Sequence, residues 1–315
     1  MRIKKHINNL YFYSLRRNNK FQTKLMKTEK EQDIIDISLK HFMIKFLSYS
    51  EGIHSYKHTK TMKGSFNILF EKIGNVNIIS ITKQVMRDYI EQRAKYVSAA
   101  TIRRDLATFS SAFKWAIKKK YHYENVTDGI ERPKLPEKLP LFFTKQEFEQ
   151  LINCIENKDL KELVIFAVYT GLRQSDIINL TWEQINFGNR TLLLTNRTNL
   201  TKSRKVHSLP LHNKIYDLLN ERNKTRINEL VFTYLGKPIL QDFISKKFRK
   251  LIRKAGLNLR LTFHTLRHTF ATWLVQNGVS IYKVSKLMTH SDVKVTQIYS
   301  HLGTTDLIEA VNMIE

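Results

Sequence analysis

Six residues in the second half of this 315-residue chain have the side chains that cleavage of a phosphodiester requires. Two arginines, a lysine and two histidines can hold a phosphate, neutralise its charge and protonate a leaving oxygen. A tyrosine can attack the phosphorus as a nucleophile. In chain order the six are Arg173, Lys202, His264, Arg267, His290 and Tyr299. These residue types predict a reaction in which a tyrosine attacks a phosphodiester and becomes linked to its phosphate.

The spacing of these residues indicates how they could be brought together. His264 and Arg267 are three positions apart, so on a helix they share a face. If that helix begins near His264, its N-terminal amide groups also favour an anion. Lys202 stands between two expected strands, where the tip of a hairpin would let its long side chain reach into a groove. We therefore expect a helix and a hairpin to present phosphate-binding groups.

Two neighbouring residues leave alternatives open. His264 and His268 are four positions apart, a spacing common among zinc ligands on a helix. No Glu or Asp follows His264 as in a metalloprotease helix, and the charge of Arg267 would repel a cation, so we expect no metal site. Asp176 lies three positions after Arg173, where it either orients Arg173 or a histidine or is an ordinary carboxylate on a helix surface.

The motifs around these residues resemble those of the tyrosine recombinases, the phage-integrase type of site-specific recombinase. The resemblance covers roughly residues 35–315, and the full set of motifs occurs in the family's order. The motifs are Thr-Gly-Leu-Arg ending at Arg173, Thr-Lys-Ser around Lys202, His-Thr-Leu-Arg-His from His264 to His268, and Tyr299 nine residues after His290. Where the family usually has Leu-Gly before this second histidine, the chain has Met288 and Thr289. That change concerns the backbone just before His290. A second departure is at Asp176, because relatives often have Glu at the matching position.

The resemblance implies a role for each phosphate-binding group. Arg173 and Arg267 would clamp the scissile phosphate, because a guanidinium is permanently charged and can donate two parallel hydrogen bonds. Lys202 would be the general acid that protonates the leaving 5′ oxygen.

The resemblance also assigns the histidines and the tyrosine. His264 and His290 would donate hydrogen bonds to the phosphate, and His264 could also accept the tyrosine proton. His268 would be a packed or hydrogen-bonded support. Attack by Tyr299 would leave a 3′-phosphotyrosyl link and a free 5′-hydroxyl, so strand exchange would need no metal, nucleotide or other cofactor.

A formal net charge of +25 favours a polyanion as partner. Residues 1–140 hold 28 Lys and Arg against 13 Asp and Glu, and residues 141–315 hold 25 against 15. Both halves are therefore basic, as two domains that grip one duplex would be, and phosphate contacts supply most non-specific DNA affinity. A basic protein that binds acidic lipid is the alternative. Candidate DNA contacts are Arg103, Arg104, Lys114, Arg204 and Lys205, although any one of them could equally be a solvated surface charge.

The implied partners are double-stranded DNA and further copies of the chain, assembled as a tetramer on two DNA sites, and accessory DNA-bending proteins fit the same scheme. In the family the tail after the tyrosine packs on a neighbouring subunit, whereas an apolar stripe in such a tail more usually docks on its own domain. The longest apolar run, 163–168, is far below a membrane span, so no membrane is expected. A single cysteine excludes an intramolecular disulfide and fits a reducing cytoplasm, where the enzyme would associate with the nucleoid when bound to DNA.

The predicted fold class is mainly α with a small antiparallel β-sheet. A four-helix, SAM-like core-binding domain would precede an α+β catalytic domain of the tyrosine recombinase type. Helices are predicted near 35–47, 66–73, 82–89, 99–120, 160–169, 212–227, 241–255, 264–276 and 281–287, and strands near 185–187, 191–194 and 206–209. Prolines, which favour extended backbone, mark a linker. The predicted parts are a basic segment at 1–34 that is either disordered or contacts DNA, the helical domain at 35–130, the linker at 131–141, and the catalytic domain with its tail at 142–315.

Several functions compete for this constellation. The leading hypothesis is integration or excision of a mobile element, and the alternative within the family is Xer-type resolution of chromosome or plasmid dimers. Type IB topoisomerases use a similar set of residues without pairing two DNA sites. A non-catalytic DNA-binding protein would be expected to lack the tyrosine or an arginine, and a metal-dependent phosphodiesterase would need clustered carboxylates. The residues therefore favour a recombinase.

Overall fold

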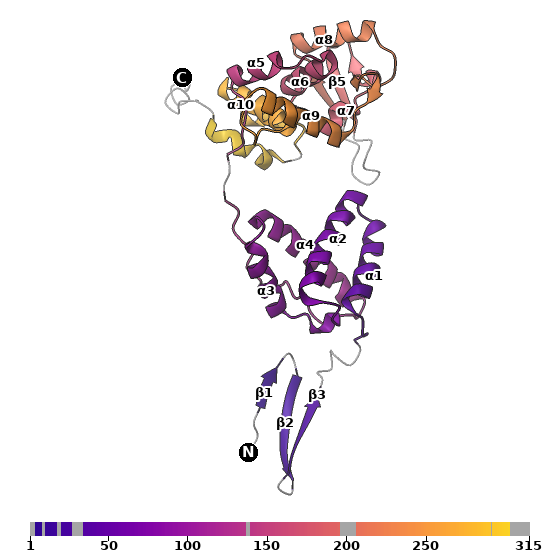
Figure 1. Cartoon of the computed structure of the whole chain (residues 1–315), viewed down its shortest axis with the longest axis vertical. Coiled ribbons are helices and arrows are strands. Elements are labelled where there is room, and N and C mark those ends of the chain that lie inside the picture. The colour runs from indigo at the N-terminus through magenta and orange to yellow at the C-terminus, as the bar shows by residue number, and fades with distance from the viewer. Residues whose placement is uncertain are drawn as a thin grey trace, which may run out of the picture. The chain divides into compact units, whose positions relative to one another are not determined.

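The computed structural model describes residues 4–7, 10–17, 20–26, 34–136, 139–195, 206–290 and 292–302. The chain divides into two compact units, Met1–Glu137 and Lys138–Glu315 (Figure 1). This division falls inside the proline-rich stretch 131–141.

Three antiparallel strands precede the helices of the first unit. They are β1 (Lys4–Ile7), β2 (Leu10–Arg17) and β3 (Lys20–Met26), paired in the order β1-β2-β3. The sequence analysis does not predict these strands, because basic residues interrupt the alternation of polar and apolar side chains. Apolar and aromatic residues such as those at 10–13 nevertheless favour extended backbone. A DNA contact by this segment stays a prediction.

Four helices form the remainder of the first unit. They are α1 (Leu39–Glu51), α2 (Tyr56–Ile73), α3 (Lys83–Ala94) and α4 (Ala99–Lys118), with a short 3₁₀ helix η2 (Ile78–Ser80) between α2 and α3. Each α-helix begins where a capping hydroxyl accepts a backbone N–H of the first turn, at Ser38, Ser55, Thr82 and Ser98. The apolar faces meet in a core that is rich in phenylalanine, including the fully buried Phe42, Phe66 and Phe109.

A buried carboxylate joins three of these helices. Asp105 of α4 is 1% exposed, and it accepts hydrogen bonds from Ser65 of α2 at 2.6 Å and from the Tyr89 hydroxyl of α3 at 2.9 Å. Arg93, also on α3, supplies the compensating charge at 3.3 Å. A buried charge is costly unless it is paired and hydrogen-bonded in this way.

In the second unit the described helices are α5 (Lys145–Asn153), α6 (Lys158–Thr170), α7 (Gln174–Ile178), η3 (Trp182–Gln184), α8 (Asn213–Lys224), α9 (Gln241–Lys254), α10 (Phe263–Gln276), α11 (Ile281–Leu287), η4 (Val293–Val295) and η5 (Gln297–Leu302). Two small sheets accompany them. β4 (Ile185–Asn186), β5 (Thr191–Thr195) and β6 (Val206–Pro210) pair antiparallel in that order, and β7 (Thr233–Tyr234) pairs with β8 (Lys237–Pro238). The predicted fold class, a helical domain followed by an α+β domain with a small antiparallel sheet, is confirmed.

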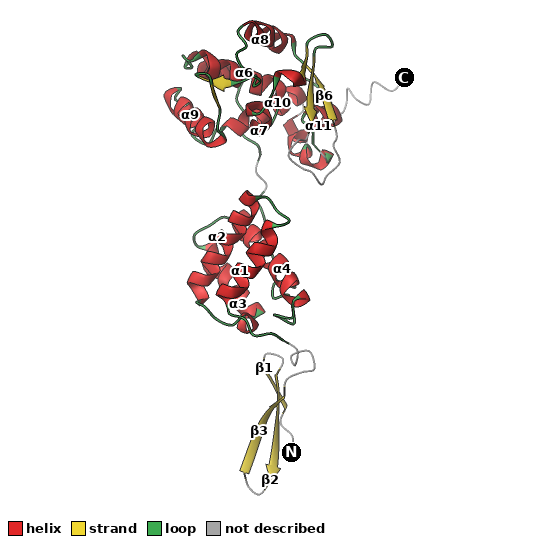
Figure 2. Cartoon of the chain, turned by 90° about the vertical axis from the view of Figure 1, so that its right-hand side faces the viewer, coloured by secondary structure: helices red, strands yellow, loops and turns green. Residues whose placement is uncertain are grey.

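Helix α10 lies at the centre of the second unit, where it packs against α6, α9 and α11 (Figure 2). Its fully buried Leu266 belongs to the same core as Phe166 of α6 and Phe248 of α9. The start of the unit is fastened to α10 by Phe143, whose N–H donates to Thr269 Oγ1 and whose carbonyl accepts from Trp273 Nε1, both at 2.9 Å. The residues that α10 presents are therefore held on a rigid element.

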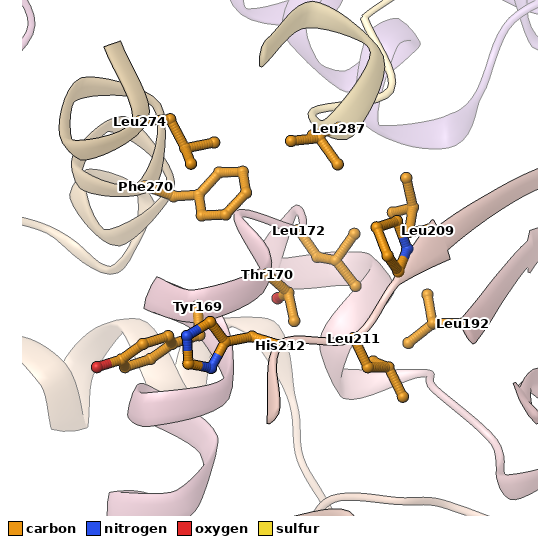
Figure 3. A pocket seen from close by; sticks show the side chains of 11 residues that line it. Tyr169, Thr170, Leu172, Leu192, Leu209, Leu211, His212, Phe270, Leu274 and Leu287 are labelled. Carbon is orange, nitrogen blue, oxygen red and sulfur yellow. The ribbon is translucent and has the colours of Figure 1, made fainter. Parts of the chain in front are cut away.

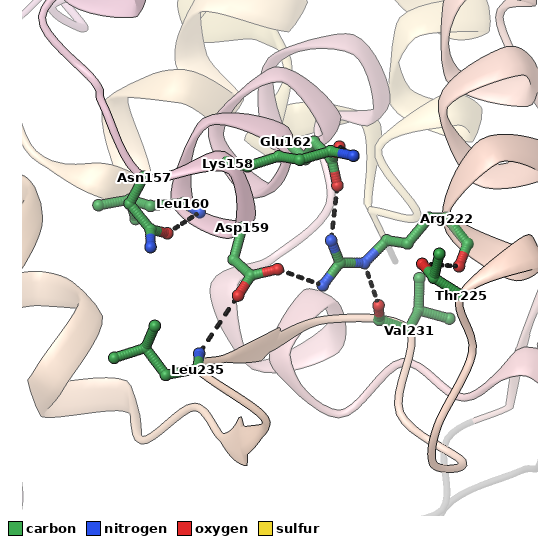
Figure 4. Close-up of polar contacts among 9 residues, drawn as sticks. All are labelled: Asn157, Lys158, Asp159, Leu160, Glu162, Arg222, Thr225, Val231 and Leu235. Carbon is green, nitrogen blue, oxygen red and sulfur yellow. Dashed lines mark hydrogen bonds and ion pairs between the residues drawn. The ribbon is translucent and has the colours of Figure 1, made fainter.

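Arg222 of α8 links this helix to α6 through ion pairs (Figure 4). The Arg222 guanidinium donates to Asp159 at 3.0 Å, to Glu162 at 2.5 Å and to the Val231 carbonyl at 2.6 Å. The side chains of Arg222, Glu162 and Asp159 are 12%, 17% and 28% exposed, so both ion pairs are partly shielded from solvent. Among the described helices, none is both long and apolar enough to cross a membrane.

Candidate active site

Five of the six predicted site residues lie within the described part of the second unit. They stand at the N-termini of α7 and α10, in the turn after α11, and in η5. Lys202 lies outside the described residues, as do the candidate DNA contacts Arg204 and Lys205 and the tail after residue 302.

A tight turn between α6 and α7 places the first arginine. Helix α6 ends at Gly171, which has a φ of +62°, in the left-handed region that favours glycine. A Cβ at this position would lie 2.2 Å from Cδ1 of Phe270, so the turn touches α10 directly. Two residues later, Arg173 is the N-cap of α7 and its side chain is exposed. Only glycine permits both this backbone and this close approach.

The second arginine is buried and holds two loops together. Arg267 of α10 is 4% exposed, and its guanidinium donates to the Gly171 carbonyl at 2.6 Å and to the Met288 carbonyl at 2.5 Å. Burial, and then the nearby charge of Arg173, lower the pKa of Arg267 to about 10. It therefore stays positively charged at neutral pH. The Arg267 side chain therefore gives the site a buried positive charge and also joins the turn after α6 to the turn after α11.

The turn after α11 carries the next candidate. His290 Nδ1 lies 2.7 Å from Thr296 Oγ1, and Thr296 is fully buried. Just before it, Thr289 adopts a φ of +53° and its hydroxyl accepts a hydrogen bond from Arg173 Nη1 at 3.2 Å. The departure from the family pattern noted above thus falls on a left-handed residue that contacts an arginine of the site.

The candidate nucleophile is buried against a histidine. Tyr299 is 1% exposed, and its hydroxyl lies 2.5 Å from Nδ1 of His268. Burial raises the pKa of Tyr299 to about 12, whereas the positive charge of Arg267 opposes that rise. The ring of His264 packs edge-on against His268, with their centroids 4.9 Å apart. The residue in contact with the phenol is therefore His268, whereas the sequence analysis named His264 as a candidate proton acceptor.

All three histidines are held neutral by their surroundings. Burial is the largest cause, and it lowers the pKa of His268 and of His290 to about 4 and also lowers that of His264. The charges of the two arginines add to the effect at His264 and His290. A site that disfavours further positive charge in this way favours an anion, whose presence would relieve the repulsion.

The predicted supporting residue Asp176 and the candidate DNA contacts lie in different surroundings. The Asp176 carboxylate accepts a hydrogen bond from Ser175 at 3.3 Å, and its charge acts on Arg267. Arg103 is half-buried and donates to the Pro133 carbonyl at 3.4 Å, whereas Arg104 and Lys114 are exposed. Within the described ranges, no three His, Cys, Asp or Glu side chains gather in a way that could hold a metal ion.

The sequence analysis missed groups that act through the backbone. The carbonyls of Gly171 and Met288, which hold Arg267, carry no signal in the side-chain pattern. Phe270 reads as an ordinary apolar residue of α10, yet it fixes the approach to Gly171. The glycine of the Thr-Gly-Leu-Arg motif was the one available signal.

A separate apolar cavity of about 230 Å³ lies behind the turn after α6 (Figure 3). Leu172, Leu211, Phe270 and Leu287 are among the residues that line it, and Figure 3 shows their side chains converging on it. None of the five candidate residues that the structure describes is in its wall. The cavity is therefore distinct from the charged site.

The chain is similar to known proteins in sequence and in fold. The Phage integrase family model matches residues 142–305, just over half of the chain. Tyrosine recombinase XerD of Staphylococcus haemolyticus is 29% identical over 258 residues, which are 77% of this chain and 85% of the relative.

Two solved structures share the fold. The Tn1549 transposon integrase in complex with a circular intermediate DNA aligns with a TM-score of 0.72 and 20% identity, over 88% of this chain and 98% of that one. A lambda integrase tetramer bound to a Holliday junction aligns with a TM-score of 0.69 and 16% identity, over 91% and 94%. The chain belongs to the phage integrase family and is a tyrosine recombinase, an enzyme that cleaves and rejoins DNA.

Proposed function

We propose that this enzyme cuts one strand of a specific DNA site through attack by Tyr299, forms a 3′-phosphotyrosyl intermediate, and rejoins the strand to a second DNA. The observation that supports this most directly is the contact of the Tyr299 hydroxyl with His268, one helical turn from His264 and next to Arg267. The Tyr299 hydroxyl from η5 thus lies beside the two imidazoles and the guanidinium that α10 carries near its N-terminus.

The two arginines would neutralise the phosphate as its negative charge grows. Arg267 uses two of its N–H groups on backbone carbonyls, and a guanidinium has others left to donate. Arg173 is exposed, and its guanidinium has further N–H groups besides the one that donates to Thr289. Preorganised donors of this kind contribute about 3–4 kcal/mol each to transition-state stabilisation in well-studied enzymes. His264 and His290 would donate the remaining hydrogen bonds, and Asp176 would support the charge of Arg267.

The Tyr299 hydroxyl holds its proton firmly in this arrangement. Its pKa is raised to about 12 while that of His268 is lowered to about 4, so the proton stays on the phenol at neutral pH. A phosphate between the arginines would raise the histidine pKa values and bring His268 closer to accepting the proton. We therefore assign His268 as the acceptor, so that activation depends on bound DNA.

Strand exchange would need no external energy source, because the phosphotyrosyl bond conserves that of the phosphodiester. Lys202 is proposed as the general acid for the leaving 5′ oxygen, on the motif that it occupies. The partners are double-stranded DNA and three further copies on two sites, as in the lambda integrase tetramer on a Holliday junction. Accessory DNA-bending proteins would help to assemble that complex.

For the biological role we favour integration and excision of a mobile element, in line with the basic N-terminal segment and the similarity to a transposon integrase. The similarity to XerD supports dimer resolution as the second candidate. In either role the enzyme would work in the cytoplasm, associated with the nucleoid while it is bound to DNA.

The test begins with selection of bound sequences from a randomised duplex library. The selected sequence is then built into duplexes nicked at successive positions, so that a cut strand is lost and the covalent complex accumulates. In EDTA, a denaturing gel should show a covalent protein–DNA band with the wild type and with Tyr282→Phe, an exposed tyrosine of the same unit. Tyr299→Phe should bind DNA and give no band.

The outcomes separate the alternatives. A band that persists in Tyr299→Phe would exclude Tyr299 as the nucleophile. A band carrying the 5′ end of the break, instead of the 3′ end, would contradict the proposed polarity. A selected sequence found at the ends of a mobile element supports integration, and one found opposite the replication origin supports dimer resolution.

A further inference from the structure

The turn between α11 and His290 has a backbone that normally requires glycine. The N–H of His290 donates to the Ser285 carbonyl at 3.1 Å, and that of Thr289 donates to the Lys286 carbonyl at 3.0 Å. These two bonds close the end of the helix in the Schellman arrangement, in which the residue after the cap is left-handed and is usually glycine. Thr289 occupies this position with a φ of +53°.

Threonine is among the least suitable residues for such a position. Its branched Cβ crowds the backbone in the left-handed region, where β-branched residues are rare. Among the described residues, the other non-glycine positions with positive φ are Lys120, Arg190 and Leu235, and none of these is β-branched. Strain of this kind persists only where the surrounding structure imposes it, and it is often found at functional sites.

The threonine hydroxyl makes a contact that glycine could not. It accepts a hydrogen bond from Nη1 of Arg173 at 3.2 Å, across 116 positions of the chain. The residue before it, Met288, gives its carbonyl to Arg267. One strained turn therefore touches both arginines of the candidate site, one through the backbone and the other through this side chain.

We propose that Thr289 is a positioning residue that orients the Arg173 guanidinium toward the phosphate. This inference rests on the proposed function. Arg173 is exposed and stands at the N-cap of a helix of only five residues, so its long side chain has many rotamers open to it. A hydroxyl that engages Nη1 selects one direction and leaves the other guanidinium N–H groups for the anion. DNA affinity, which depends on many contacts, is expected to change little.

Three substitutions separate the hydroxyl from the backbone strain. Thr289→Val keeps the branched shape and loses the hydroxyl, so single-turnover cleavage at saturating DNA should fall about tenfold with unchanged DNA affinity. Thr289→Ser keeps the hydroxyl and should cleave within about twofold of the wild type. Thr289→Gly loses the hydroxyl but relieves the strain, so cleavage should fall as with valine while the melting temperature of the catalytic unit rises by about 2–4 °C.

A matched control relieves backbone strain at a residue outside the candidate site. Leu235 has a φ of +50°, is 70% exposed and lies in the β7–β8 hairpin. Leu235→Gly should raise the melting temperature in the same direction and leave cleavage unchanged. If Thr289→Val cleaves as fast as the wild type, or if Thr289→Ser is as slow as valine, the hydroxyl does not orient Arg173 and the inference is overturned.

A thermal double-mutant cycle tests the contact without DNA. The melting temperatures of wild type, Thr289→Val, Arg173→Ala and the double variant should be non-additive, because each single change removes the same hydrogen bond. Additive shifts would show that the two side chains are not coupled. A different outcome is that the melting temperatures are non-additive but the wild type does not cleave its selected site. That result would overturn the proposed function, and with it the catalytic purpose of the contact.

Discussion

Replacing Gly171 by alanine should damage both the stability of the catalytic unit and its chemistry. At φ +62°, alanine costs about 1 kcal/mol net, after allowing for its less flexible unfolded chain. The new Cβ would also lie 2.2 Å from Phe270 Cδ1, and overpacking of this kind typically costs about 1–3 kcal/mol. We therefore expect the free energy of unfolding to fall by about 2–4 kcal/mol in total.

Gly256 offers a matched control for the backbone contribution. It has nearly the same φ, +64°, and a Cβ there would meet nothing within 4 Å. Gly256→Ala should therefore cost about 1 kcal/mol and leave cleavage normal. Gly171→Ala should also slow cleavage by about a hundredfold, because the displaced turn carries Arg173 and the carbonyl that holds Arg267.

Urea unfolding followed by tryptophan fluorescence measures these free energies. A Trp115→Phe background leaves Trp182 and Trp273, both in the catalytic unit, as the reporters. In a Phe270→Leu background the penalty of Gly171→Ala should shrink by at least about 1 kcal/mol, since the ring is what the new methyl meets. Equal penalties for the two glycines would refute the view that close packing against α10 sets this turn.

Other substitutions test separate parts of the structure. Arg267→Lys should cleave nearly as poorly as Arg267→Ala in the suicide-substrate assay, because one ammonium cannot take the place of a guanidinium that spans two backbone carbonyls, and a lysine variant with most of the wild-type rate would contradict this. Arg222→Met should lower the free energy of unfolding by about 2–3 kcal/mol, because Asp159 loses its charged hydrogen bond and Glu162 keeps only the exposed Lys158 at 3.8 Å, and a loss below about 1 kcal/mol would show that the network is unimportant. The catalytic unit should lose stability as the pH falls from about 6.5 towards 4, because the unfolded chain binds protons at His268 and His290 that the folded chain, with both pKa values near 4, does not. In urea titrations, the free energy of unfolding of the double variant His268→Gln, His290→Gln should depend less steeply on pH than that of the wild type. The same pH dependence in both proteins would indicate that other groups carry the effect.

The motif order along the chain predicted the fold class. It also singled out side chains that the structure brings together around α10, because the described motifs at Arg173, His264 and His290 lie where helices begin or end. The helix that carries His264 and Arg267 begins one residue before His264, as its apolar spacing indicated. The capping box of Thr144 and Glu147 at the start of α5 has the Thr-x-x-Glu form that is recognisable from sequence. Local sequence is sufficient for such features, because caps and periodicity act within one or two turns.

The contacts between distant segments could not be predicted in the same way. His268 and Tyr299 are 31 positions apart, and whether they meet depends on how η5 folds back on α10. The left-handed backbone of Thr289 is set by the two hydrogen bonds that end α11, in a position where the residue type argues against it. The strands at residues 4–26 were missed because basic side chains obscure their pattern.

The attachment point of the DNA is the most direct test of the central claim, that Tyr299 is the nucleophile. The covalent complex would be trapped on a nicked site, trimmed with nuclease and digested with trypsin. No lysine or arginine follows Lys294, so Tyr299 lies on the final peptide, 295–315, which contains no other tyrosine. Mass spectrometry should find the nucleotide adduct on this peptide, at Tyr299. An adduct on any other peptide, or at another residue of this one, would contradict the account.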